Sequence, residues 1–119
     1  MESILNSVKK DLGIMPDYTH FDDDVIMCIN TAFSVLTQIG VGPSEGFSIS
    51  DDTTTWSDYL GSASAPRMEL VKSYVAKKVR SIFDPPSSSS VNEALNKVIS
   101  ELEWRISVYV DPADTFPIT

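Results

Sequence analysis

The chain has 119 residues and a mass of 13.1 kDa, with 42% hydrophobic residues, 22% charged residues and a net charge of −8. These values are typical of one folded domain and exclude collagen-like, disulfide-rich and wholly disordered chains. The longest apolar run, Val25 to Ile29, is far shorter than the roughly 20 residues of a membrane-spanning helix. We therefore expect no membrane partner.

The first part of the chain contains two segments with helical periodicity. Apolar residues recur at helical spacing in residues 2–12 and again in 22–39, and each segment is followed by a glycine that favours helix termination. We expect Asp22 to be the N-cap of the second helix, with Asp23 and Asp24 in its first turn, where carboxylates complement the helix dipole.

Residues 40–66 lack this periodicity and are rich in Gly, Ser and Thr. The alternation around Phe47 and Ile49 indicates a short strand or an extended loop edge. The capping-box spacing of residues 55–58 predicts one or two helical turns, with Trp56 among the residues that hold the loop to the body. Because so long a loop in a small domain is usually functional, we predict loop contacts through Phe47, Ile49 and Trp56.

Two more helices are expected in the second half of the chain. One spans residues 66–83, starts with a proline and has a basic polar face; the other starts at a capping box in residues 90–93 and carries its apolar stripe to Ile106. The sequence thus predicts an all-α bundle of four main helices with an irregular insertion. The predicted core combines stripes from three helices: Val25, Ile29, Phe33, Val71, Val75, Val79, Leu95, Val98 and Leu102.

The end of the chain has a different pattern. After Ser107 the sequence is too interrupted by proline for a helix and too apolar for an inert tail. We therefore assign residues 1–110 to the helical domain and 111–119 to an extended C-terminal arm. Docking of this arm on a partner would use Tyr109, Phe116 and Ile118.

Charge is distributed unevenly along the sequence. Residues 17–58 contain eight acids and no Lys or Arg, whereas residues 67–80 contain five basic residues and one acid. We predict a heterologous contact in which the acidic stretch of one copy faces the basic helix of the next, a geometry that closes into rings or extends into filaments. The predicted subunit interface contains Asp22, Asp23, Asp24, Lys72, Lys77, Lys78 and Arg80.

Two other functions compete with self-assembly. The basic helix 66–83 could contact phosphates in a small nucleic-acid-binding protein. The acids of residues 22–24 could ligate Mg²⁺ or Ca²⁺ in a metal-dependent enzyme, but successive helical residues diverge by about 100° around the axis and do not converge on one ion. Cys28 lies in an apolar helix and His20 has no nucleophile motif beside it, so we predict no catalytic residue, metal or cofactor.

Seven segments are spread in order over residues 11–106: DLGI (11–14), YTHFDDDVI (18–26), QIGVGP (38–43), WSDYLG (56–61), KSYVAKKVR (72–80), FDPPSS (83–88) and ELEWRI (101–106). Each segment alone is ordinary helix, cap or turn sequence. Their order and spacing resemble the tailed-phage head-tail connector (head-completion adaptor) proteins.

The resemblance implies a structural virion protein without enzymatic activity. It implies a homo-oligomeric ring, commonly a dodecamer, between the portal protein and a tail or stopper protein, with transient passage of DNA through the lumen and no sequence-specific binding. The expected location is the head-tail junction of the virion, and the host cytoplasm during assembly. In such a ring, the loop 40–66 would face the lumen or the next ring, and the arm 111–119 would dock on the portal.

Overall fold

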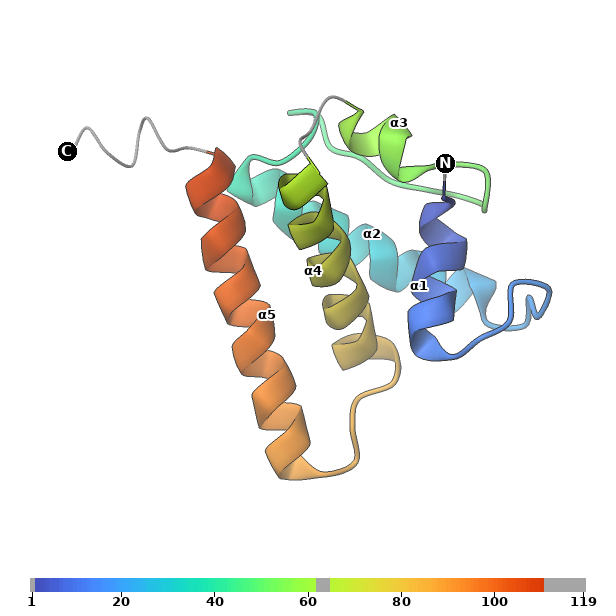
Figure 1. Ribbon diagram of the computed structural model, residues 1–119. Coiled ribbons are helices and arrows are strands. Elements are labelled where there is room, and N and C mark those ends of the chain that lie inside the picture. The colour runs from blue at the N-terminus through green and yellow to red at the C-terminus, as the bar shows by residue number, and fades with distance from the viewer. Residues whose placement is uncertain (1, 62–64, 111–119) are drawn as a thin grey trace.

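The computed structural model describes residues 2–61 and 65–110, which form five helices (Figure 1). The described residues contain no β-strand, so the all-α prediction is confirmed. No helix among them is both long and apolar enough to cross a membrane. The helices are α1 (Ile4–Leu12), α2 (Asp22–Ile39), α3 (Trp56–Leu60), α4 (Ala65–Phe83) and α5 (Ser89–Val110).

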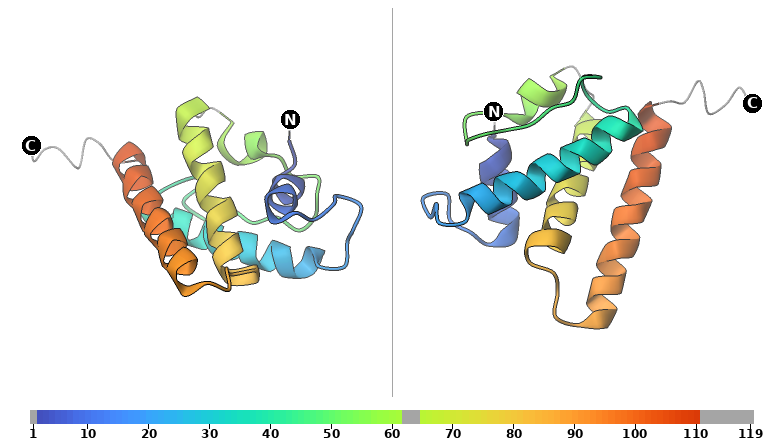
Figure 2. Two further views of the ribbon diagram at one scale, coloured as in Figure 1. Left: turned by 60° about the horizontal axis from the view of Figure 1, so that its bottom comes forward. Right: turned by 180° about the vertical axis from the view of Figure 1, so that it is seen from behind.

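Helix α4 lies at the centre of the bundle. Helix α5 runs antiparallel beside it, α2 crosses one face of the α4–α5 pair, and α1 packs against both α4 and α2 (Figures 1 and 2). The α2 and α4 stripes are fully buried as predicted, each at 0% exposure: Val25, Ile29, Phe33, Val71, Val75 and Val79. These two helices therefore supply most of the core.

The predicted core of the last helix is wrong at Val98, whereas Leu95 and Leu102 pack against the core as predicted. Val98 is 40% exposed, and Leu95 and Leu102 are only half-buried, whereas Ile99 and Ile106 are buried. The physical reason is that α5 lies at the edge of the bundle, where it packs mainly against α4 and buries only a narrow stripe (Figure 1).

The helix ends predicted from glycine residues agree with the structure better than those predicted from polar capping residues. Gly13 and Gly40 both adopt left-handed backbone conformations that close α1 and α2, as expected. The prediction of Asp22 as an N-cap is wrong: Phe21 is the N-cap, no side chain caps the helix, and Asp22 is the first helical residue. The carboxylate of Asp22 instead pairs with Lys9.

Helix α5 is longer than predicted at both ends. Its N-terminus is capped by Ser88, whose hydroxyl accepts a hydrogen bond from the backbone N–H of Val91, so the capping box predicted at residues 90–93 does not form. At the other end the helix continues to Val110, because a proline at position 112 disfavours helical conformation only at the residue before it. Tyr109 therefore belongs to the helix.

The segment between α2 and α3 is irregular but tightly held. The Asn30 side chain donates to the carbonyl of Ile49 at 3.0 Å and accepts from the N–H of Ile49 at 2.8 Å. At the far end of the loop, Thr55 forms an isolated antiparallel bridge with Ser3, and the Trp56 indole donates to the Ser7 hydroxyl at 2.9 Å. The loop is thus tied to α2 at one point and to the start of α1 at another.

An aromatic cluster fills the space between this loop and α2. The ring of Phe33 lies 4.6 Å from that of Tyr59, 5.4 Å from that of Phe47 and 6.5 Å from that of Trp56, measured between centroids. Gly42 lies against the cluster with a φ of +80°, and a Cβ there would lie 2.7 Å from the Tyr59 ring. The close approach of the backbone to Tyr59 requires glycine at this position.

Candidate assembly surfaces

The acidic start of α2 is only partly available to a partner. Lys9 of α1 is 1% exposed, and its ammonium lies 2.7 Å from a carboxylate oxygen of Asp22 and donates to the carbonyl of Pro16 at 3.0 Å. Asp22 therefore joins α1 to α2 within the subunit. Asp23 and Asp24 are exposed and remain free to face another molecule.

The burial of Lys9 was not predicted from the sequence. Its spacing in the sequence indicated this burial, because Lys9 follows Leu5 by four residues and so lies on the apolar face of α1. A charge on that face requires a partner within reach, and Asp22 supplies it.

The predicted basic face of α4 is also partly engaged within the subunit. Lys72 pairs with Glu2 at 3.2 Å and with Glu69 at 3.8 Å, and the Arg80 guanidinium donates to the carbonyl of Asp84 at 3.0 Å. Lys77 and Lys78 are half-buried and form no ion pair with any described residue. These two lysines are the cations of the face that are best able to bind a partner.

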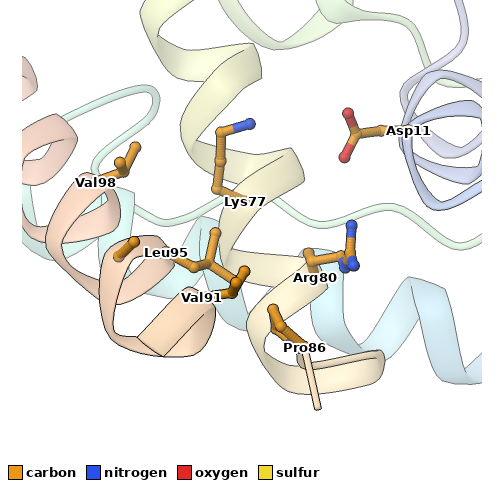
Figure 3. Close-up of a pocket in the computed structure, with 8 residues that line it drawn as sticks. Asp11, Lys77, Arg80, Pro86, Val91, Leu95 and Val98 are labelled. Atoms are coloured by element: carbon orange, nitrogen blue, oxygen red, sulfur yellow. The ribbon is translucent and has the colours of Figure 1, made fainter. Parts of the chain in front are cut away.

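A groove next to Lys77 separates the C-terminal half of α4 from the N-terminal half of α5. It encloses about 330 Å³; Lys77 and Arg80 project on one side of it, and apolar residues of α5 line the other (Figure 3). Val91 and Val98 in its wall are 54% and 40% exposed. We call this site the basic groove; it is lined by Asp11, Lys77, Arg80, Pro86, Val91, Ala94, Leu95 and Val98.

A second concave surface lies at the other end of the same helix pair, where α4 starts and α5 ends. It encloses about 570 Å³ and contains Trp104, which is 67% exposed. The guanidinium of Arg67 lies 5.4 Å from the Tyr109 ring centroid and donates to the Tyr109 carbonyl at 3.0 Å. We call this site the aromatic patch; it is lined by Pro66, Arg67, Leu70, Trp104, Arg105, Val108 and Tyr109.

The residues predicted to make loop contacts lie mainly inside the subunit. Ile49 and Trp56 are 5% and 2% exposed, and Phe47 is half-buried against the rings of Phe33 and Tyr59. Their side chains hold the loop to its own core. Two residues of the predicted docking arm, Phe116 and Ile118, lie outside the described residues, whereas Tyr109 is 40% exposed on α5.

The acidic and basic interface residues are not segregated to opposite sides of the molecule. The rings of Phe21 and Phe83 are 5.6 Å apart, which places the start of α2 beside the end of α4. Asp22 and Arg80 therefore belong to neighbouring parts of one surface. The two ends of the α4–α5 pair, with the basic groove at one and the aromatic patch at the other, differ more clearly in chemistry.

No described group has the features of a reactive centre. Cys28 is buried, and burial, together with the charge of Asp24, raises the pKa of its thiol, which favours the unreactive protonated form. His20 is exposed, with its ring 4.8 Å from that of Phe21. Within residues 2–61 and 65–110, no three His, Cys, Asp or Glu side chains are grouped so that they could hold a metal ion.

The described residues thus form a helical bundle with chemically unlike concave surfaces at the two ends of one helix pair. The chain belongs to the phage connector protein family, whose model matches residues 4–113. The comparisons with curated proteins and with solved structures returned no match. Membership confirms the resemblance seen in the sequence and identifies a structural component of the phage particle, which acts in assembly with other head and tail proteins.

Proposed function

We propose that the protein is the subunit of a ring that lies below the portal, extends the DNA channel and joins the head to the tail, without catalysing a reaction. The observation that carries this proposal is the match to the connector family over residues 4–113, which includes every helix of the fold. The proposal places the protein at the head-tail junction of the virion, next to the portal on one side and a tail or stopper protein on the other.

Two features of the surface support assembly into a ring. A ring requires heterologous contacts, in which one surface of a subunit binds a different surface of the next. The basic groove and the aromatic patch are unlike surfaces at opposite ends of the α4–α5 pair. In the proposed ring, Lys77 and Lys78 face exposed acids of the neighbouring copy.

The net charge of the chain suits a channel protein. The net charge of −8 gives little overall attraction for DNA. Each Lys or Arg contact with a phosphate adds affinity, and affinity would slow a genome moving through a lumen. The proposed ring therefore lets DNA pass without holding it.

The basic helix also suggests a second function, nucleic-acid binding, which the structure makes less favourable. Of the four cations in the predicted interface, Lys72 forms ion pairs with Glu2 and Glu69, and Arg80 donates to the backbone carbonyl of Asp84. The ammonium groups of Lys77 and Lys78 have neither an ion pair nor a hydrogen bond to a described residue. If α4 does bind DNA, affinity at low salt will fall when Lys77, Lys78 and Arg80 are changed to Gln. Absence of binding at low salt would remove this function.

Electron microscopy of the purified protein mixed with its portal protein tests the proposal. We expect closed rings of the protein stacked on the portal and sharing its axis. A monomer alone in solution is compatible with the proposal, because ring subunits can require the portal as a template. A mixture in which the portal carries no added ring, at protein concentrations well above those of the portal, would contradict it.

A further inference from the structure

The aromatic patch exposes large aromatic side chains to solvent. Trp104 is 67% exposed and Tyr109 is 40% exposed, beside a cavity of about 570 Å³ to which Leu70 and Val108 also contribute. Trp, Tyr and Arg are the residues most enriched at the energetic centres of binding surfaces. The patch therefore has the composition of a site that binds an apolar or aromatic side chain.

The chemistry of the patch matches a segment of the same chain. Arg67 and Arg105 are the two cations in the lining of the patch, which contains no acid. Arg105 is paired with Glu101 at 2.7 Å, and Arg67 contacts the ring and the carbonyl of Tyr109. Residues 111–119 contain two aspartates, no basic residue, and two large apolar side chains, Phe116 and Ile118. Acids matched to arginines and apolar side chains matched to Trp104 give complementarity of both charge and hydrophobicity.

The segment also continues directly from the patch, because α5 ends at Val110, one residue after Tyr109. Trp104 precedes Val110 by six residues, which is about 9 Å along a helix. Phe116 follows Val110 by six residues, which can span up to about 20 Å when extended. The chain is therefore long enough to bring Phe116 back to Trp104.

We propose that residues 111–119 bind the aromatic patch of their own chain, with Phe116 and Ile118 packed against Trp104 and the aspartates near Arg67 and Arg105. A tethered segment reaches a nearby site at an effective concentration of about millimolar. The same segment of a second copy, present at micromolar concentration, is about a thousandfold more dilute. The segment of the same chain is therefore the favoured occupant of the patch. This proposal does not depend on the ring, because it concerns the free subunit.

Tryptophan fluorescence of the full-length protein tests this contact, because the two tryptophans differ in exposure. Trp56 is 2% exposed and Trp104 is 67% exposed among the described residues, so quenching by acrylamide, a neutral molecule, reports mainly on Trp104. We expect the double variant Phe116→Ala/Ile118→Ala to be quenched more strongly than the natural protein, with its emission shifted to longer wavelength. Thr115→Ala in the same segment is the matched control and is expected to leave both unchanged.

A Trp104 variant and a series of protein concentrations show which tryptophan reports the contact and whether the contact lies within one chain. Trp104→Phe must remove the difference between the natural protein and the double variant, which assigns the signal to the patch. Protection that grows with protein concentration would show that a second copy occupies the patch and would overturn the proposal. Equal quenching of the natural protein and the double variant at every concentration would overturn it as well.

Discussion

Tyr59 and Tyr74 are both buried, but they differ in what their hydroxyl groups contact. The Tyr74 hydroxyl donates to a carboxylate oxygen of Glu103 at 2.8 Å and so links α4 to α5. The Tyr59 hydroxyl has no hydrogen-bond partner among the described residues. Burial raises the pKa of both phenols, and Glu103 raises that of Tyr74 further.

The two tyrosines therefore give a matched pair of variants. Tyr74→Phe should lower the free energy of unfolding by about 1.5 to 3 kcal/mol, because it removes a hydrogen bond to a charged group. Tyr59→Phe should be neutral or stabilise the fold by up to about 1 kcal/mol, because it removes a buried hydroxyl without a partner. Urea denaturation at pH 7 measures both, and equal losses in the two variants would contradict this difference.

The same pair predicts a pH dependence. A phenol whose pKa is raised in the folded state keeps its proton where the unfolded chain releases it, so folding stability is fully present below about pH 10 and is lost as the pH rises further. Tyr59→Phe should therefore reduce the alkaline loss of stability without a cost at pH 7. Denaturation midpoints at pH 7 and at alkaline pH provide this comparison.

Lys9 provides a second prediction for a single residue. Lys9→Met keeps most of the side-chain volume but leaves the Asp22 carboxylate and the Pro16 carbonyl without their partner, so we expect a loss of about 2 to 3 kcal/mol. Asp22→Asn should cost at least as much, since it leaves the more deeply buried ammonium without its counter-charge. The double variant should recover part of the loss. Additive losses in a double-mutant cycle would show that the two charges are not coupled.

At the level of elements, the connection from α2 to α3 depends on Asn30. Asn30→Ala removes both side-chain hydrogen bonds to the backbone of Ile49 and should cost about 1 to 2 kcal/mol. Asn30→Asp keeps the acceptor for the Ile49 N–H but replaces the donor with a carboxylate oxygen that repels the Ile49 carbonyl, so it separates the two hydrogen bonds. We expect amide exchange at Ile49 to be fastest in the alanine variant and intermediate in the aspartate variant. Unchanged exchange in both would contradict a role for Asn30 in ordering the loop.

The elements also show how far the sequence alone could be interpreted. The ends of α1 and α2 were predictable because Gly13 and Gly40 adopt backbone conformations that few other residues tolerate. Which apolar residues of α5 are buried was not predictable, because periodicity shows that a helix has an apolar face but not how many neighbouring helices cover it. Val98 fits the apolar stripe and is nevertheless 40% exposed, since α5 lies at the edge of the bundle.

The candidate surfaces were predictable only in part, for a related reason. The sequence identified the charged residues but not their pairing across the fold, because the partner of Lys9 is thirteen positions away, and Glu2, one of the two partners of Lys72, is seventy positions away. The aromatic patch combines residues from the start of α4 and the end of α5, about forty positions apart, which only the antiparallel packing brings together. Contacts over such separations depend on the tertiary arrangement.

At the scale of the whole molecule, the proposed ring predicts a separation between folding and assembly. Lys77→Glu/Lys78→Glu should leave the fold intact, because neither ammonium is paired with a described residue, and should weaken self-association or portal binding. Lys10→Glu is a control that reverses one exposed charge of α1 outside both surfaces. Circular dichroism checks the fold, and sedimentation with the portal measures assembly. Unchanged assembly would argue against this contact but not against membership of the family.

If the protein joins the head to the tail, particles made without it should fail both to retain DNA and to carry tails. The measurement is the fraction of such particles that protect their DNA from added nuclease and carry tails in electron micrographs. We expect particles that lose their packaged DNA and lack tails, with both defects repaired when the protein is supplied. Particles that keep their genomes and carry tails normally in its absence would show that the protein does not join head to tail.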